Sequence, residues 1–384
     1  MSKIHVFQVA KSSGGVGSYV RRLVRHINKD RFQITVACLS EGAEEMVAEL
    51  SQIPGVNAFS IPMEHHISVF SDLYVVYRLY KTIRKEKFDL IHAHTSKPGF
   101  FVRLAAIGTR IPIIYRPANF SFYDGVSKWR IALYVLLERF AARYLTERLM
   151  FVSSGEREMA KDYKVGVDAQ FTLIRTGINV REFEPTAEAD NILDKYKIPA
   201  DAKVVGTVAR LVEDKAPFDF LLAAKLVHDQ YPNAHFVWVG DGPLENDLYK
   251  KVKEFDLQDV FHLVGYQSNV KGFLQAMDIF VLSSTSEGLS ISMLEAMASG
   301  LPVISTLVNG ADETIRDGET GFLVPIGDSV KIGEAILKLL SVPSFMQEMG
   351  RRAREHIRNH FSFEEMINKI ESLYEEIYNS KLEN

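Results

Sequence analysis

The sequence predicts an α/β protein of two domains, each built around a doubly wound parallel sheet. Short apolar segments of strand length alternate with longer segments of helical periodicity along almost the whole chain. The alternation occurs in two blocks, and repeated strand–helix units of this kind form parallel sheets with helices on both faces. The length of 384 residues is sufficient for two domains that each bury a core.

The first block begins with an apolar strand and a turn, Gly14-Gly15-Val16-Gly17, that opens the first helix. Further apolar runs then alternate with segments in which apolar residues recur every three or four positions. The expected strands are at residues 4–9, 32–39, 90–94, 111–115 and 149–153. The expected helices are at residues 18–27, 69–87, 101–108 and 129–147.

The same pattern starts again after a polar segment at residues 175–201 that contains Pro185 and Pro199, which we interpret as the linker. The strands expected in this block are at residues 203–208, 235–240, 260–264 and 279–282, and the helices at 218–230, 244–255 and 290–298. The sequence therefore predicts Rossmann-like domains at residues 1–180 and 181–362. A charged amphipathic helix at residues 363–384 is expected to pack back on the first domain.

The composition is that of an ordinary globular protein, with 47% hydrophobic and 24% charged residues. A net charge of −4 argues against a nucleic-acid binder that relies on a general basic field. The single cysteine, Cys38, cannot form an internal disulfide, and no residues have zinc-ligand spacing. The chain starts directly with a strand and lacks a signal peptide or a long apolar run, so a cytosolic protein is expected.

The segment at residues 286–304 carries the most chemical information. It follows an apolar strand and reads as a loop, a helix and a second buried strand. Ser290 is a suitable N-cap, and Gly300 ends the helix. Glu287 then lies on the loop just ahead of the helix, and Glu295 lies about one turn inside it.

A phosphate is the ligand best suited to the start of this helix, because helix N-termini offer free N–H groups and partial positive charge. A carboxylate repels phosphate, so Glu287 and Glu295 are expected to accept hydrogen bonds from hydroxyl groups instead. A ligand with central phosphates and hydroxylated rings at both ends is a nucleoside-diphosphate sugar. The alternative is that either glutamate is a capping or solvated residue, although Glu295 lies between the apolar Leu294 and Ala296.

These residues resemble the retaining GT-B-fold glycosyltransferases of family four, the glycosyl transferases group 1. The spacing of Glu287 and Glu295 is similar to the E-x7-E motif of that family, and the matching Ala-Ser-Gly-Leu-Pro-Val follows at residues 298–303. Further matching motifs extend over nearly the full chain, at residues 14–17, 91–94, 206–215, 239–243, 264–266 and 318–325. The resemblance implies that the first domain binds the acceptor and the second binds the donor, with the two domains facing across a cleft.

The resemblance also implies roles for individual residues. It assigns the donor diphosphate to Arg210, Lys215, Gly288, Leu289 and Ser290, together with Gly15 and Gly17 of the glycine-rich turn. Glu295 would bind the ribose hydroxyls, and Glu287 would act as a catalytic residue on hydroxyls of the transferred sugar. Two cations and a helix terminus can stabilise a leaving diphosphate, so neither a metal ion nor a cofactor is expected.

His92 and His94 lie two positions apart on an expected strand and therefore share one face of the sheet. This spacing allows a metal pair, but no third ligand is suggested; a core histidine bonded to a backbone carbonyl is the other alternative. By resemblance, His94, near the carboxyl end of the strand, is the catalytic histidine beside the transferred sugar. Retention of anomeric configuration is likewise implied by the resemblance only.

Two other functions fit parts of the sequence. The fragment at residues 15–20 is close to the G-x-G-x-x-G dinucleotide pattern, and Glu41 follows the next strand, which would indicate an NAD-dependent oxidoreductase. However, Val20 replaces the third glycine, and the motifs of the second block have no use in a dehydrogenase. A non-catalytic nucleotide-sugar-binding protein would keep Arg210 and Glu295 but show no turnover.

The segments at residues 94–99 and 133–143 resemble the bacterial capsule and exopolysaccharide branch of the family. The expected reaction is therefore transfer from a nucleoside-diphosphate sugar, a UDP-sugar, to a saccharide or polyprenyl-linked acceptor in cell-surface polysaccharide biosynthesis. The helix at residues 69–87 combines aromatic and basic residues that suit an anionic bilayer, the alternative being a sheet-covering helix with a solvated basic end. The expected location is the cytoplasm, including the cytoplasmic face of the inner membrane.

Overall fold

The computed structural model describes residues 3–40, 42–64, 67–122, 126–184 and 188–383. Contacts divide the chain into two compact units. The first unit runs to Thr176 and takes in the chain from Glu364 onward, and the second runs from Gly177 to Phe363. Glu41, the acidic residue of the dinucleotide-binding alternative, and Pro185 of the expected linker lie outside the described residues.

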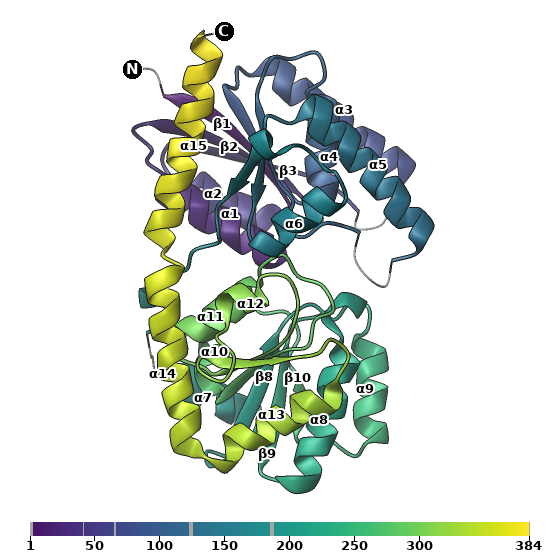
Figure 1. Cartoon of the computed structure of the whole chain (residues 1–384), viewed down its shortest axis with the longest axis vertical. Helices are drawn as coiled ribbons and strands as arrows, with labels where there is room; N and C mark the ends of the chain where they lie inside the picture. The colour runs from purple at the N-terminus through teal and green to yellow at the C-terminus, as the bar shows by residue number, and fades with distance from the viewer. Residues whose placement is uncertain (1–2, 41, 65–66, 123–125, 185–187, 384) are drawn as a thin grey trace. The chain divides into compact units, whose positions relative to one another are not determined.

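The first unit is built on a parallel sheet. In the described part of this unit, seven strands occur in the order β3-β2-β1-β4-β5-β6-β7. The strands β1, β2 and β3 are labelled in Figure 1. They are β1 (Ile4–Ala10), β2 (Phe32–Leu39), β3 (Val56–Ile61), β4 (Leu90–His94), β5 (Ile113–Arg116), β6 (Arg148–Phe151) and β7 (Phe171–Leu173). The strand order reverses between β1 and β4, which makes the carboxyl ends of these two strands the expected place for a ligand.

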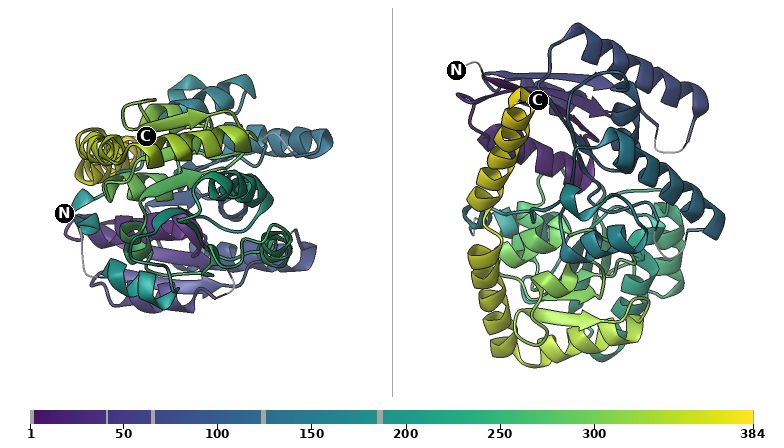
Figure 2. Two further views of the ribbon diagram at one scale, coloured as in Figure 1. Left: turned by 90° about the horizontal axis from the view of Figure 1, so that it is seen from below. Right: turned by 45° about the horizontal axis from the view of Figure 1, so that its top comes forward.

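Helices cover both faces of this sheet. They are α1 (Gly14–His26), α2 (Glu44–Ser51), α3 (Val69–Lys85), α4 (Ser96–Ala105), α5 (Lys128–Leu145), α6 (Ser154–Asp162) and α15 (Phe363–Glu383). Side chains of α3, α4 and α5 bury an apolar core against one face, for example Leu79, Val102 and Ala142. The last helix, α15, packs on the sheet as well (yellow in Figure 2), where Tyr374 lies against Phe32 with ring centroids 5.7 Å apart.

The second unit repeats the architecture. Among its described residues, six parallel strands occur in the order β10-β9-β8-β11-β12-β13, which reverses between β8 and β11. They are β8 (Lys203–Val208), β9 (Ala234–Val239), β10 (Phe261–Leu263), β11 (Ile279–Leu282), β12 (Val303–Thr306) and β13 (Gly321–Val324). The helices are α7 (Glu188–Lys195), α8 (Pro217–Gln230), α9 (Glu245–Glu254), α10 (Lys271–Ala276), α11 (Ile291–Ala298), α12 (Ala311–Thr314), α13 (Ser329–Ser341) and α14 (Pro343–His360).

The predicted fold class, two doubly wound parallel α/β sheets, is confirmed. Several elements were missed: β3 and β7 lie at the edges of their sheet and are only partly buried, so they lack a strong apolar pattern. The segment expected as a linker contains α7, and Tyr196 just beyond this helix packs on Phe273. The glycines of residues 14–17 form the first turn of α1 rather than a loop before it.

The helix expected at residues 101–108 begins earlier, at Ser96, and ends at Ala105. Pro98 lies within its first turn, where a proline is tolerated because its missing N–H would have no intrahelical partner. Among the described helices, none combines the length and apolar character needed to span a bilayer.

Candidate functional site

The predicted site residues of the second unit gather where its strand order reverses. Arg210 and Lys215 follow β8, and Glu287 follows β11. These two strands are direct neighbours, with Ile279 paired to Val205. The fold therefore brings together side chains that are more than seventy positions apart in the sequence, at the edge where ligands bind in open parallel sheets.

Lys215 and Glu287 form an ion pair, which the sequence did not predict. The Lys215 Nζ lies 2.9 Å from Glu287 Oε1 and 3.1 Å from Asp214 Oδ2. Burial lowers the pKa of Lys215, but the Glu287 and Asp214 carboxylates outweigh this effect, and the pKa is raised above its ordinary value. Lys215 is thus a held cation whose ammonium position is set by two carboxylates.

Glu287 is fixed from a second side as well. The Ser284 hydroxyl donates to Glu287 Oε1 at 2.9 Å, and the Ser283 hydroxyl donates to the carbonyl of Lys215 at 2.9 Å. Sequence reasoning missed both serines and Asp214. Their position beside the motif residues was the available signal, because short hydroxyl and carboxylate side chains next to a charged residue commonly bond to it.

The start of α11 is built as predicted. Ser290 caps the helix, and its hydroxyl accepts a hydrogen bond from the N–H of Met293. Gly288, Leu289 and Ser290 are buried residues immediately ahead of the first turn. Gly310 packs directly on them: a Cβ at this position would lie 2.8 Å from the carbonyl oxygen of Gly288. A second glycine thus shapes the turn whose backbone was predicted to meet phosphate.

Glu295 and Arg210 differ sharply in their surroundings. Glu295 is only 6% exposed within α11, as its apolar neighbours in the sequence suggested. Arg210 is exposed, and no ion pair is seen for it among the described residues. A solvent-exposed guanidinium on the same segment after β8 as Lys215 can form bidentate hydrogen bonds to phosphate oxygens without first breaking an internal pair.

The glycine-rich turn of the first unit has a packing role that the sequence did not reveal. Gly15 is exposed at the start of α1, whereas Gly17 is buried. A Cβ on Gly17 would lie 2.1 Å from the carbonyl oxygen of Ser12, so any side chain there would displace the backbone. The predicted phosphate role of Gly15 and Gly17 stays a prediction, and Gly17 is required by close packing in any case.

His94 lies in a buried polar cluster on the sheet face that α1 and α15 cover. Its Nε2 is 2.8 Å from Gln8 Oε1, Gln8 Nε2 donates to the Tyr374 hydroxyl at 2.8 Å, and this hydroxyl is 2.6 Å from His92 Nδ1. His92 therefore has a side-chain partner rather than the backbone carbonyl considered above. The Tyr19 ring covers His94 edge-on, with centroids 5.7 Å apart.

The same cluster contains a buried cation. Arg116, the cross-strand partner of His94, donates to the Thr176 hydroxyl at 3.0 Å and lies over the Tyr19 ring at 3.9 Å. Burial lowers the pKa of His94 well below its ordinary value, and nearby His92 and Arg116 lower it further. Burial, with help from Arg116, likewise lowers the pKa of His92 to about 3. Both imidazoles are therefore neutral at physiological pH.

A metal pair at these histidines lacks a further ligand. In the part of the chain that the structure describes, no group of three or more His, Cys, Asp or Glu side chains could hold a metal ion. Metal independence of the reaction stays a prediction.

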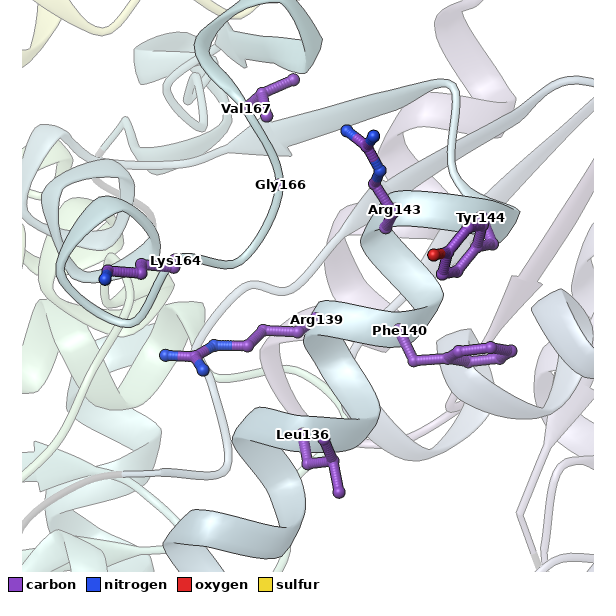
Figure 3. A pocket seen from close by; sticks show the side chains of 8 residues that line it. All are labelled: Leu136, Arg139, Phe140, Arg143, Tyr144, Lys164, Gly166 and Val167. Carbon is purple, nitrogen blue, oxygen red and sulfur yellow. The ribbon is translucent and has the colours of Figure 1, made fainter.

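A hollow on the surface of the first unit contains none of the predicted site residues. Figure 3 shows that it is lined by side chains of α5 and of the segment at residues 164–167. The lining consists of Leu136, Arg139, Phe140, Arg143, Tyr144, Lys164, Gly166 and Val167. It combines apolar and basic groups, unlike the hydrogen-bonding groups around Lys215 or His94.

Two family models match the chain. The model described as Glycosyl transferases group 1 matches residues 188–356, and the model described as Glycosyl transferase 4-like domain matches residues 14–177. Together they cover most of both units, and neither is a model of a dinucleotide-dependent oxidoreductase.

Curated relatives align over most of the chain. UDP-Gal:alpha-D-GlcNAc-diphosphoundecaprenol alpha-1,3-galactosyltransferase of Escherichia coli is 29% identical over 351 residues, which cover 90% of this chain and 89% of that protein. The capsular polysaccharide biosynthesis glycosyltransferase CapM of Staphylococcus aureus is 28% identical over 330 residues, covering 85% and 87%. Among solved structures, HepE of Anabaena in complex with UDP has a TM-score of 0.78 at 20% identity, covering 98% of this chain and 100% of that one. This level of identity shows a shared fold.

Proposed function

Because the chain belongs to the family of glycosyl transferases group 1, we propose that it moves a sugar from a UDP-sugar to a saccharide or polyprenyl-linked acceptor. The relatives support this choice of substrates, since the Escherichia coli protein is named for UDP-Gal and a diphosphoundecaprenol acceptor. The name of CapM supports a place in cell-surface polysaccharide biosynthesis. Retention of anomeric configuration is proposed from the family resemblance.

The observation that carries the proposal is the held Lys215 beside the start of α11. As the bond between sugar and diphosphate breaks, negative charge develops on the leaving nucleoside diphosphate. A cation fixed by Glu287 and Asp214 needs no reorganisation to meet that charge. The free N–H groups at the start of α11 add partial positive charge, and Arg210 adds a second cation.

We assign Glu287 and Glu295 to hydroxyl groups of the donor. Glu287 uses Oε1 for Lys215 and Ser284, so its Oε2 is the oxygen assigned to a sugar hydroxyl. Glu295 is assigned to the ribose hydroxyls, and His94 of the first unit to a hydroxyl of the substrate sugar. Each role requires a hydrogen-bond acceptor, which an ionised carboxylate or a neutral imidazole provides.

Nucleotide binding tests the proposal directly. A UDP-sugar at 100 times its Kd should stabilise the protein by about 2.7 kcal/mol, because it binds only the folded state. NAD should give no shift in Tm. The Lys215→Ala variant should lose most of the UDP-sugar shift, whereas Lys225→Ala, which removes a surface lysine of α8 paired with Asp229, should keep it. Stabilisation without sugar transfer would indicate a binding protein, and a shift with NAD alone would overturn the proposal.

Chelation tests the proposed metal independence. Lys215, Arg210 and the start of α11 supply the positive charge that a metal ion would otherwise provide at the diphosphate. Transfer measured after exhaustive treatment with EDTA should therefore stay within about twofold of the untreated rate, since no step depends on a Lewis acid. If EDTA abolishes transfer and added Mg²⁺ or Mn²⁺ restores it, the reaction depends on a metal ion.

A lipid-linked acceptor requires access to a membrane, and the outer face of α3 is suited to this contact. On this helix an aromatic residue is followed one turn later by a cation lying against its ring: Tyr74 and Arg78, Tyr77 and Lys81, and Tyr80 and Arg84. Phe70, at the start of the helix, is 89% exposed. The acidic Asp72 is paired with Lys97 at 2.7 Å, so the exposed charges nearby are basic.

The helix α5, which packs on the same core as α3, also exposes aromatic and basic residues. Its exposed apolar residues recur every three or four positions and so form one stripe: Trp129, Leu133, Leu136, Phe140 and Tyr144. Arg139 and Arg143 flank this stripe and line the hollow of Figure 3. Apolar and basic side chains together match the interface of an anionic bilayer, where aromatic rings insert and cations meet lipid phosphates.

Charge reversal on α3 tests the membrane contact. The double variant Arg84→Glu/Lys85→Glu should bind vesicles of anionic phospholipid at least about tenfold more weakly, because each basic residue near the surface contributes about 1 kcal/mol. Cosedimentation with the vesicles measures this. The matched control Lys250→Glu/Lys253→Glu carries the same change in net charge on α9 of the second unit and should bind like the wild type. Equal binding by both double variants would exclude a role for α3.

A further inference from the structure

The hydroxyl of Tyr374 is buried beside the candidate catalytic histidine, although Tyr374 lies near the end of the chain. The strand register explains the meeting: Gln8 of β1 is the partner of His92 on β4, and His94 lies two positions further on the same face. The helix α15 lays Tyr374 on this face. Its ring packs against Phe32 and His92, contacts that phenylalanine would make equally well. The hydroxyl is therefore what distinguishes tyrosine at this position.

The hydrogen bonds of this cluster link His94, Gln8, Tyr374 and His92 in a chain. Gln8 donates through Nε2 to the Tyr374 oxygen at 2.8 Å, which leaves Gln8 Oε1 as an acceptor. The nitrogen 2.8 Å from Oε1 is His94 Nε2, so this nitrogen must carry the hydrogen. At the other end, the Tyr374 oxygen already accepts from Gln8, so its own hydrogen is available to His92 Nδ1, which lies 2.6 Å away.

The chain of hydrogen bonds determines what His94 can offer a substrate. With its hydrogen on Nε2, a neutral imidazole has a lone pair on Nδ1 and can only accept there. Among the described residues, His94 Nδ1 has no hydrogen-bond partner although the side chain is 0% exposed. A buried acceptor without a partner is unfavourable in the free protein and is satisfied when a hydroxyl group donates to it.

We propose that Tyr374 is a positioning residue: acting through Gln8, it holds His94 with its hydrogen on Nε2, so that Nδ1 accepts a hydrogen bond from a substrate hydroxyl. The inference rests on the proposed function, because it presumes that His94 contacts the substrate sugar. It makes α15, the last helix of the chain, a part of the reaction machinery rather than only a cover of the sheet. Without the Tyr374 hydroxyl, the Gln8 amide is free to turn and present its N–H groups to His94, which moves the hydrogen to Nδ1 and removes the acceptor.

We call this action of Tyr374 on His94 through Gln8 the relay. The kinetics of sugar transfer test it. Tyr374→Phe should lower kcat about tenfold, by analogy with the loss seen when a hydrogen-bond partner that orients a metal-ligating histidine is removed. The matched control is Tyr378→Phe, the same change one turn along α15 at a partly buried tyrosine, and it should keep the wild-type rate. In a His94→Ala background, Tyr374→Phe should change kcat by less than about twofold, because the two residues act as one unit. An equal loss in both backgrounds would mean that Tyr374 only stabilises the fold and would overturn the relay.

The tautomer of His94 gives a second test that does not depend on activity. Nitrogen-15 NMR distinguishes a protonated ring nitrogen from an unprotonated one, and the His94 signals can be assigned by their loss in His94→Ala. The wild type and Tyr378→Phe should show hydrogen on Nε2, and Tyr374→Phe should show it wholly or partly on Nδ1. An unchanged His94 spectrum in Tyr374→Phe would overturn the relay. If the spectrum changes but His94→Ala transfers sugar at the wild-type rate, the relay stands and the role of His94 in the proposed function fails.

Discussion

Replacing Lys215 with alanine should lower kcat/KM for sugar transfer by about 100- to 1,000-fold, the loss seen when one preorganised donor to a developing negative charge is removed. Lys215 is held 2.9 Å from Glu287 and 3.1 Å from Asp214. Without it, two carboxylates remain at the edge of the sheet where the leaving diphosphate gains charge. In the variant, the leaving diphosphate is therefore repelled by these carboxylates instead of being attracted by the Lys215 ammonium. Steady-state kinetics with a UDP-sugar measure the effect.

Two comparisons separate this loss from a change in folding. Lys225→Ala removes a partly exposed lysine of α8 and should leave kcat/KM unchanged. Circular dichroism should show the same secondary structure in Lys215→Ala as in the wild type, because the ion pair lies at the end of the strands rather than in the apolar core. Transfer at the wild-type rate by Lys215→Ala would remove the diphosphate role from this residue.

Glu287→Ala should likewise nearly abolish transfer, for a different reason. The variant leaves Lys215 with Asp214 as its remaining carboxylate partner, so the cation can move, and the acceptor for the sugar hydroxyl is lost. Because Lys215 and Glu287 act as one unit, the two losses should not multiply. The kcat/KM of the double variant Lys215→Ala/Glu287→Ala should be at most about tenfold below that of either single variant. Full multiplication of the two losses would show that the residues act independently.

The meeting of Lys215 and Glu287 could have been predicted from the sequence, because it follows from strand order alone. Once residues 203–208 and 279–282 are recognised as strands of one doubly wound sheet, the segments after them emerge at the same edge. The cap at Ser290 and the burial of Glu295 were equally available, since both depend on residues within one helical turn. Local patterns and strand order therefore account for the site of the second unit.

The environment of His94 could not be predicted in this way. It depends on which residue of α15 meets β1 and β4, and that register is set by packing over more than 300 positions of sequence. An amphipathic pattern shows which face of residues 363–384 is buried, but it does not show that Tyr374 meets Gln8. Buried charged residues are hidden for a related reason: Arg103 and Glu138 look in the sequence like surface positions of two helices.

Replacing Arg103 with methionine should destabilise the first unit by about 3–5 kcal/mol, because it leaves a buried carboxylate without its cation. Arg103 is 0% exposed and donates to Glu138 Oε2 at 2.8 Å, to the carbonyl of Gly99 at 3.0 Å and to Thr146. Its guanidinium also lies 3.8 Å above the Tyr115 ring, and the Tyr115 hydroxyl donates to Glu138 at 3.0 Å. Urea unfolding followed by circular dichroism measures the change.

The second unit provides an internal control, because the chain has two tryptophans. In a Trp129→Phe background, Trp238, buried in the second unit, is the remaining reporter, and its unfolding should not shift with Arg103→Met if the units unfold separately. Arg143→Met makes the same substitution at an exposed position of α5 and should change stability by less than about 0.5 kcal/mol.

The double variant Arg103→Met/Glu138→Leu decides between two accounts of this pair. If the ion pair itself stabilised the fold, removing both charges would lose at least as much stability as removing one. The attraction within a buried ion pair is, however, largely offset by the free energy of desolvating both charges. Apolar side chains do not incur this cost, so replacing both partners together is often neutral or stabilising. The double variant should therefore regain most of the stability lost by Arg103→Met, leaving a smaller deficit from the lost hydrogen bond between Tyr115 and Glu138. A double variant as unstable as the single one would show that the loss comes from the packing of Arg103 over Tyr115 rather than from the uncompensated Glu138 carboxylate.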